Sequence, residues 1–131
     1  MSVGGDAVKS DGYRLVNLDT GETLADRIRF ARGPIQRLLG LLVSPDLESR
    51  EVLWLEPCNG IHTCGMTRSI DALVLDNHGV ILAFHQRVRP WRIVPPIRGG
   101  RVTVEANVGA ISPSDAAIGT TVGWIKIGDP V

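Results

Sequence analysis

The segment 70–75 (IDALVL) limits the possible folds of this chain more than any other. Every residue in it except Asp71 is apolar, which is typical of a β-strand that is buried on both faces. The residues that follow, Asp76-Asn77-His78-Gly79, have the composition of a turn. The segment 80–88 then returns as the expected hairpin partner, so a buried hairpin is predicted for this part of the chain.

Turn residues divide much of the remaining chain into further short β segments. Strands are predicted at 13–18 and 24–31, joined by a turn at 19–22. In the second of these, Leu24, Ile28 and Phe30 share one face, and Asp26 is the exception. The other expected elements are strands at 52–55, 61–66, 102–106 and 122–127, an irregular Pro-rich loop at 90–100 and a single helical turn at 112–118.

One segment has the pattern of an α-helix. Gly33-Pro34 precedes a run with helical spacing of apolar residues, and Pro suits the first turn of a helix. Ser44-Pro45 then ends the pattern. We therefore expect one α-helix near residues 34–43, packed on the strands, and a fold that is mainly β, either a sandwich or a barrel.

Length and charge restrict the domain organisation and the classes of function. A chain of 131 residues fits a single β domain, which we place at 12–131 after a disordered leader at 1–11. The formal net charge is zero, so no overall field favours nucleic acid or an anionic membrane. The sequence has no apolar run long enough for a membrane span and no hydrophobic signal region, so we expect a cytoplasmic protein with reduced cysteines.

An ordered set of short motifs resembles a known family. The set begins in the predicted helix and continues through both halves of the β region. It comprises Arg37-Leu38-Leu39-Gly40-Leu41-Leu42, Cys58, Ile61-His62-Thr63, Gly65-Met66, Ile70-Asp71, Leu75-Asp76 with Gly79, Arg89-Pro90-Trp91, and Glu105 with Gly109. In this order and spacing, over about residues 24–128, the set resembles the bacterial and archaeal family called domain of unknown function 192.

The resemblance implies a fold more than an activity. It implies a β sandwich or barrel with one helix packed on it, and no established reaction, cofactor or ligand. Many members of the family carry a signal peptide or a lipid anchor, which this sequence lacks, so exported roles are not expected here. Two positions depart from the family pattern, because Cys64 stands where the family usually has an aromatic residue and Arg68-Ser69 where it often has Phe-Pro.

The segment 57–64 (PCNGIHTC) contains the densest chemistry. On a strand, residues two apart point to the same face, so His62 and Cys64 would project together. Thiolate and imidazole are ligands that suit zinc or another transition metal, and Cys58 would join them if Asn59-Gly60 turns the chain back. A thiol nucleophile activated by His62 is a second hypothesis, and packed thiols with a hydrogen-bonded histidine are the structural alternative.

Two carboxylates interrupt apolar strands. Asp71 lies in the run at 70–75, and Glu105 lies between Val104 and Ala106. A buried carboxylate is costly unless it is paired or hydrogen-bonded. We favour a structural role for Asp71, in which it accepts backbone N–H bonds and fixes a loop, over a role as a general base or ligand.

Arginine residues gather around Trp91 between residues 87 and 101. Arg beside an aromatic ring can bind phosphates or carboxylates and can stack on flat groups. The structural alternative is a solvated, proline-stiffened loop in which Trp91 covers the end of the core. The candidate ligand-binding residues are His62, Asp71, Arg89, Trp91, Arg92 and Glu105.

Three functional hypotheses follow from these patterns. The first is a non-catalytic binding module for an unknown protein or a small anionic ligand, because the sequence contains no Gly-x-Ser-x-Gly elbow, no phosphate-binding loop and no dinucleotide fingerprint. The second is a small metalloprotein, possibly a hydrolase, that binds zinc through Cys58, His62 and Cys64. The third is a purely structural role for the cysteine and histidine segment.

Overall fold

A computed structural model describes residues 8–31, except 11, and residues 47–131, with backbone only for 8–10. Strands dominate it, and the short 3-10 helix Pro113–Asp115 forms within the helical turn predicted at 112–118. No α-helix occurs in this described part, and none of its helices could cross a membrane. The strands are β1 (Val8–Ser10), β2 (Tyr13–Asn17), β3 (Thr23–Ala25), β4 (Arg27–Ala31), β5 (Glu51–Leu55), β6 (Ile61–His62), β7 (Ile70–Leu75), β8 (Ile81–Val88), β9 (Ile93–Val94), β10 (Val102–Asn107) and β11 (Val122–Lys126).

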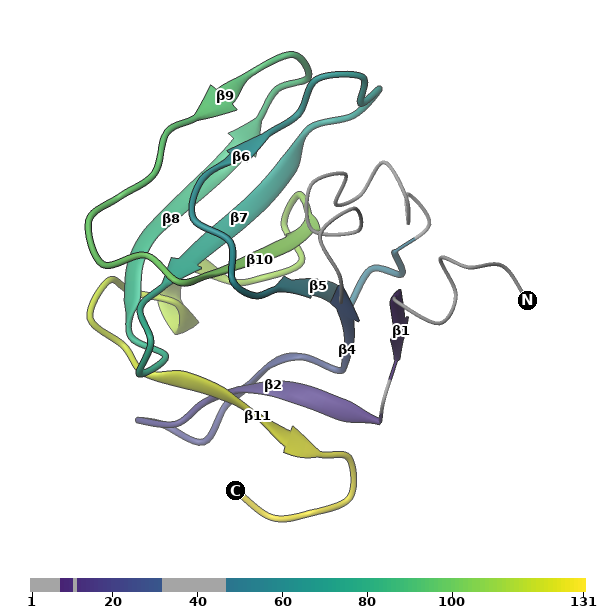
Figure 1. The fold of residues 1–131 in the computed structure, drawn as a ribbon. Helices are drawn as coiled ribbons and strands as arrows, with labels where there is room; N and C mark the ends of the chain where they lie inside the picture. Colours follow the sequence, from purple (N-terminus) through teal and green to yellow (C-terminus); the bar gives the residue numbers. More distant parts are fainter. Residues whose placement is uncertain (1–7, 11, 32–46) are drawn as a thin grey trace.

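The strands form three sheets, which confirms the mainly β class. The largest has six strands in the order β1-β4-β5-β10-β7-β8. A second sheet has the order β11-β2-β3, and β6 pairs with β9 in a third, two-stranded sheet. Figure 1 shows β6 and β9 at one end of the molecule and β2 and β11 at the other.

The hairpin predicted around 70–88 is confirmed. All residues of β7 are buried, and β7 lies between β10 and β8 in the large sheet. The turn at 76–79 closes through the Gly79 amide, which donates to the Asp76 carbonyl oxygen at 3.2 Å. The pairing shifts register between Ile70 and Ala72, opposite Arg87, where the backbone φ angle is +54°. This irregularity is a β-bulge, and it turns the end of β8 out of the regular ladder.

The strand predicted at 24–31 is two strands that belong to different sheets. β3 pairs with β2, whereas β4 pairs with β1 and β5. The chain changes sheet at Asp26, whose amide donates to the Arg50 carbonyl oxygen at 2.8 Å instead of joining a ladder. The polar exception in the apolar pattern therefore marks the point where the chain leaves one sheet for the other.

β4 and β5 are parallel neighbours, with Ile28 opposite Val52. Parallel strands need a crossover connection, commonly a helix. The helix predicted near 34–43 falls within this connection, but it lies outside the described residues and stays a prediction. The leader predicted at 1–11 is corrected at its end, because residues 8–10 pair with β4 as strand β1.

The main apolar core joins two of the sheets. It contains Leu15 and Leu24 from the small sheet together with Val52, Leu73 and Val104 from the large one. A second cluster lies toward β6 and includes Leu53, Met66 and Ile70, with Cys58 and Ile61 packed against it. Both clusters depend on β5, because its alternate residues supply both.

Candidate functional site

The cysteine and histidine segment does not continue as a strand beyond His62. β6 ends there, and the Met66 amide donates to the Thr63 carbonyl oxygen at 3.1 Å in a turn. Gly65 has a φ angle of +86°, a conformation that glycine tolerates best. The prediction that His62 and Cys64 project together from one strand is therefore wrong, because the strand ends at His62 and the chain turns.

The predicted metal ligands are not brought together. Within the described residues, no group of three or more His, Cys, Asp or Glu side chains could hold a metal ion. Cys58 packs against the second core cluster, and its thiol donates to the Gly60 carbonyl oxygen at 3.4 Å. The His62 Nδ1 atom is buried and has no hydrogen-bond partner within this part of the chain. The zinc site proposed on Cys58, His62 and Cys64 is thus not formed by these side chains.

Asp71 has the structural role that was favoured for it. Its Oδ1 accepts the Arg87 amide at 2.8 Å, and its Oδ2 accepts the Gly109 amide at 3.0 Å. The residue is buried, as is Glu105 in β10. Neither carboxylate lies on the exposed surface of Arg89, Trp91 and Arg92, and the two Asp71 bonds fix the backbone at Arg87 and Gly109.

Thr63 holds the segment 89–92 in a fixed conformation. Its amide donates to the Arg92 carbonyl oxygen at 2.8 Å, and its carbonyl accepts the Trp91 amide at 3.0 Å. Its hydroxyl accepts the Arg92 amide at 2.9 Å and donates to the Arg89 carbonyl oxygen. Thr63 is fully buried, so the backbone and hydroxyl of one residue satisfy polar backbone groups of Arg89, Trp91 and Arg92.

Asn59 anchors the later part of the same loop. Its side-chain amide donates to the Ile97 carbonyl oxygen at 2.7 Å, and its Oδ1 accepts the Ile97 amide at 3.0 Å. Gly100 makes this contact possible, because a Cβ atom there would lie 2.3 Å from the Asn59 Oδ1. The Pro-rich loop is therefore tied to the segment after β5 at two separate points.

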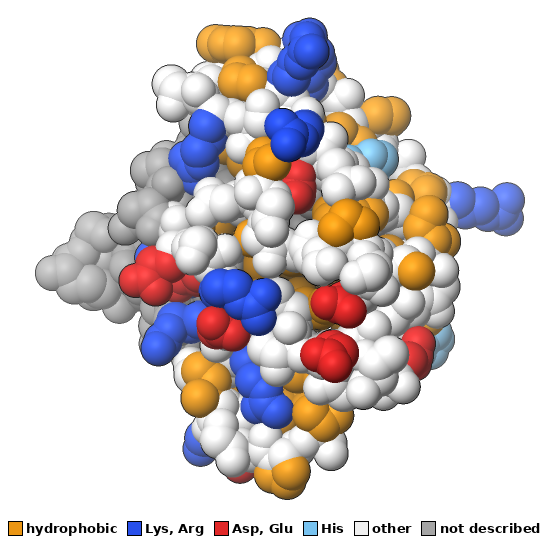
Figure 2. All heavy atoms as spheres, turned by 180° about the vertical axis from the view of Figure 1, so that it is seen from behind, with side chains coloured by type: hydrophobic (Ala, Val, Ile, Leu, Met, Phe, Trp, Pro, Cys, Tyr) orange, Lys and Arg blue, Asp and Glu red, His pale blue; other side chains and the backbone are white. Residues whose placement is uncertain are grey.

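The anchored turn presents an exposed surface that is both basic and apolar. We call Arg89, Trp91, Arg92 and Ile93 the Arg-Trp surface. Trp91 is 67% exposed and Ile93 is 75% exposed. At the end of the molecule that carries β9, Figure 2 shows Lys and Arg side chains among hydrophobic ones. Within the described residues, neither Arg89 nor Arg92 forms an ion pair.

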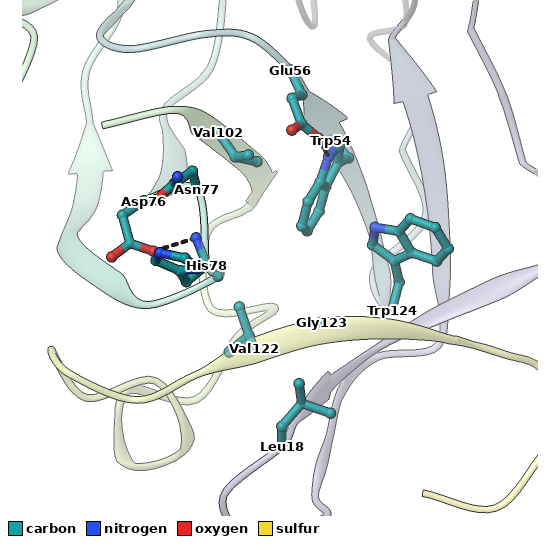
Figure 3. A pocket seen from close by; sticks show the side chains of 11 residues that line it. Leu18, Trp54, Glu56, Asp76, Asn77, His78, Val102, Val122, Gly123 and Trp124 are labelled. Carbon is teal, nitrogen blue, oxygen red and sulfur yellow. Dashed lines mark hydrogen bonds between the residues drawn. The ribbon is translucent and has the colours of Figure 1, made fainter. Parts of the chain in front are cut away.

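A pocket lies at the other end of β8, where β11 meets the large sheet. It has a volume of about 320 Å³. Its lining combines apolar side chains with the turn after β7: Leu18, Trp54, Glu56, Asp76, Asn77, His78, Gly79, Val102, Val122, Gly123 and Trp124. Figure 3 shows the two indoles on one side of the pocket and the turn 76–78 on the other.

Gly79 allows the turn to approach β11. Its φ angle is +84°, and a Cβ atom at this position would lie 2.4 Å from the Val122 carbonyl oxygen. The Val122 amide donates to the Gly79 carbonyl oxygen at 2.9 Å, which fixes the turn beside Trp124. The absence of a side chain at Gly79 therefore brings the polar wall of the pocket close to the aromatic wall.

Two carboxylates are held at the pocket by different donors. The Trp54 indole nitrogen donates to Glu56 Oε1 at 3.0 Å. Asp76 Oδ1 accepts the amides of His78 at 2.8 Å and Val80 at 2.9 Å. The Val80 amide has the largest effect and lowers the pKa of Asp76. Desolvation, the next largest, raises it, but the amides of His78 and Gly79 and the His78 imidazole lower it further, so the pKa lies below its ordinary value. Asp76 is therefore negatively charged at neutral pH.

The chain matches the model of a family described as DUF192, Uncharacterized ACR, over residues 16–124. The chain belongs to DUF192. The resemblance inferred from the motifs is thereby confirmed, and the family is one of uncharacterised proteins.

Relatives of this DUF192 chain carry no assigned activity in their names. A UPF0127 protein of Thermococcus sibiricus is 30% identical over 114 residues, covering 84% of this chain and 73% of the relative. A UPF0127 protein of Pyrococcus furiosus is 27% identical over 116 residues, covering 86% and 99% of the two chains. These matches identify the family and leave its function open.

Two solved structures share the fold of the DUF192 chain. A protein of unknown function from Novosphingobium aromaticivorans superposes with a TM-score of 0.71 at 14% identity, covering 89% of this chain and 85% of that one. A protein from Sinorhizobium meliloti, described as a proposed transcription regulator, superposes with a TM-score of 0.70 at 16% identity, covering 90% and 95%. At these identities the likeness concerns the fold alone.

Sequence reasoning missed two groups of residues in this DUF192 chain. Thr63 was part of the family motif, but its role in fixing the loop depends on backbone groups that lie far along the chain. The pocket residues Trp54, Glu56 and Trp124 showed no pattern, because they come from strands that are distant in sequence. The tryptophans themselves were the available signal, since a partly exposed aromatic residue on a strand often marks a contact surface.

Proposed function

We propose that this protein is a non-catalytic interaction module that binds an acidic segment of a partner protein through the Arg-Trp surface. The observation that carries the proposal is the conformation of Trp91. Its φ angle is +62°, and its side chain is 67% exposed. A bulky residue with positive φ is a genuine outlier, and such conformations cost of order 1–3 kcal/mol.

The conformation is held by the surrounding structure and does not depend on burial of the indole. Thr63 forms hydrogen bonds with the backbone on both sides of Trp91, at Arg89 and Arg92, and its carbonyl oxygen accepts the Trp91 amide at 3.0 Å. An exposed Trp forgoes the burial that usually stabilises it. A site for recognition accounts for both features, because a preorganised aromatic anchor lowers the entropic cost of binding.

The chemistry of the neighbouring side chains indicates the kind of partner. Segment 87–101 contains arginines and no Asp or Glu. Guanidinium groups bind carboxylates through paired hydrogen bonds, and Trp and Arg are enriched at the energetic centres of protein interfaces. Ile93 is 75% exposed beside Trp91, so the partner is expected to present an apolar recess flanked by carboxylates.

We also propose that the protein acts in the cytoplasm. Cys58 and Cys64 are free thiols and both are partly buried, which supports a reducing compartment.

The test is a selection from a random-peptide display library on the full chain, with counter-selection on the double variant Trp91→Ala/Arg92→Ala. We expect the selected peptides to be rich in Asp and Glu around apolar residues. Fluorescence anisotropy with a synthetic selected peptide should show at least about tenfold weaker binding for Trp91→Ala. Ile118→Ala is the matched control, because Ile118 is 71% exposed but lies in another loop, and it should leave the affinity unchanged.

Two results would overturn the proposal. The first is a set of selected peptides that bind the double variant as well as the wild type. The second is Trp91-dependent binding of duplex DNA or anionic phospholipid vesicles with no acidic peptide selected. The DNA arm is included because a structural neighbour is described as a proposed transcription regulator.

A further inference from the structure

The pocket at Trp54 and Trp124 is separate from the Arg-Trp surface. The pocket borders the turn before β8, and the Arg-Trp surface follows the end of β8. β8 has 8 residues, so at about 3.3 Å per residue the two sites lie roughly 25 Å apart. A ligand of the pocket would therefore be recognised independently of the proposed protein partner.

The aromatic wall of the pocket belongs to a cluster of packed rings. Phe30 packs against both indoles, with ring centroids 6.3 Å from Trp54 and 5.4 Å from Trp124. Tyr13 contacts Trp124 edge to face at 4.9 Å. Trp54 is almost fully buried and Trp124 is 46% exposed, so the cluster leaves one indole largely open to the pocket and to solvent. A wall held in this way needs no rearrangement to receive a ligand.

Two carboxylates contribute to the polar part of the pocket. Glu56 and Asp76 line it together with Asn77 and His78, and no Lys or Arg is found among its described lining residues. Figure 3 shows Glu56 beside the Trp54 indole and Asp76 in the turn on the opposite side of the pocket. Glu56 is kept in place by the Trp54 indole, and Asp76 by the amides of its own turn. Aromatic rings and carboxylates together attract positive charge more strongly than either does alone.

We propose that this pocket binds a small organic cation that carries a methylated ammonium group. Such a group is attracted to indole rings and to nearby carboxylates. When the nitrogen is fully methylated it has no N–H, so the pocket does not need to supply a hydrogen-bond acceptor for it. The volume of about 320 Å³ leaves room for a ligand of the size of choline or larger. A ligand with its own carboxylate is disfavoured, because Glu56 and Asp76 would repel it.

A substitution at Arg101 tests whether the ligand of the pocket is cationic or neutral. Its Nε lies 3.8 Å from Glu56 Oε2, and its side chain is 52% exposed. This loose ion pair competes with a ligand cation for Glu56. Arg101→Ala should therefore strengthen the binding of a cation by about threefold and leave the binding of a neutral ligand unchanged.

The experiment is an NMR titration of the full chain with millimolar choline. The sequence has 3 tryptophans, so their indole N–H signals report separately on the pocket and on the Arg-Trp surface. We expect the Trp54 and Trp124 signals to shift and the Trp91 signal to stay in place. The neutral isostere 3,3-dimethylbutan-1-ol should shift none of them under the same conditions.

Variants that keep the fold test the charge directly. Glu56→Gln and Asp76→Asn preserve the acceptor oxygens for Trp54 and for the turn, and each should weaken choline binding about fivefold. Trp124→Ala should weaken it at least about tenfold. Trp91→Ala is the matched control and should leave choline binding unchanged, which also separates this result from the proposed partner site.

Three outcomes would overturn the inference. One is the absence of any shift at Trp54 and Trp124 with choline. Another is equal binding of the neutral isostere, which would show that the pocket recognises shape alone. The third is a shift with methyl glucoside but not with choline, which would assign the pocket to carbohydrates.

Discussion

Both carboxylate oxygens of Asp71 accept backbone amides, one from the bulge at Arg87 and one from the turn at Gly109. These amides belong to positions with positive φ angles, which no regular ladder would satisfy. Thr63 and Asn59 act in the same way on the Pro-rich loop. Single polar side chains, each contacting irregular backbone far along the chain, therefore hold the loops that surround the candidate sites.

Asp71→Asn should lower the free energy of unfolding by about 3 kcal/mol, because the new amide group places an N–H donor against a backbone N–H donor in a buried site. Urea denaturation measures the loss. Asp26→Asn is the matched control, since its side chain is 64% exposed and forms only a surface ion pair with Arg50. Its expected effect is below about 1 kcal/mol. Equal losses for the two variants would contradict the structural role of Asp71.

At the scale of elements, the short sheet of β6 and β9 supports the Arg-Trp surface. Only Ile61 with Val94 and His62 with Ile93 are paired in it. An isolated ladder of this length is not stable by itself. The turn between β8 and β9 is instead stabilised by Thr63, immediately after β6, so the position of the Arg-Trp surface depends on a residue just outside the strand.

Thr63→Val should lower the free energy of unfolding by about 2 kcal/mol, because it leaves the Arg92 amide and the Arg89 carbonyl without their partner at nearly constant volume. It should also speed hydrogen exchange of the Arg92 amide. Thr63→Ser retains the hydroxyl and should keep that amide protected. If Thr63→Val exchanges as slowly as the wild type at Arg92, the hydroxyl does not hold the turn.

At the scale of the whole molecule, the large and the small sheet share one core. Leu15 of β2 and Leu73 of β7 belong to the same buried cluster, although they lie in different sheets. This arrangement supports the prediction that residues 12–131 form a single domain. The candidate pocket lies at the same junction, so its shape depends on both sheets.

Leu15→Ala should lower the free energy of unfolding by about 3 kcal/mol, because it removes a fully buried side chain from the shared core. Far-ultraviolet circular dichroism and tryptophan fluorescence should report the same midpoint in the variant, as expected for one cooperative unit. Separate midpoints would mean that the small sheet unfolds by itself, and would contradict the single domain.

The sequence alone predicted the features that depend on neighbouring residues. The apolar run 70–75 indicated a buried strand, and the composition of 76–79 indicated its turn. Both hold because burial pattern and turn chemistry are local properties of the chain. The ordered motifs also identified the family, since their spacing extends over most of the chain.

The sequence led to a wrong prediction at residues 61–66, where the strand pattern was weak. Residues 61–66 alternate like a strand, but the chain turns after His62 and the predicted convergence of His62 with Cys64 is lost. The alternation of apolar and polar residues in one segment cannot show where the strand ends, because its hydrogen-bonded pairing depends on the length of the neighbouring strand. Among the strands of the described residues, β6 pairs with β9 alone, and β9 contains two residues.

The tertiary structure alone decided which distant residues meet. Trp54 and Trp124 line one pocket because β11 pairs with β2 and lies against the edge of the core formed by β5 and β10. Trp91 is exposed because Thr63 holds its backbone in place. Patterns among neighbouring residues predicted most of the strands and turns, and the ordered motifs identified the family. The surfaces that could bind a partner or a ligand required the packing of remote segments, which local patterns do not encode.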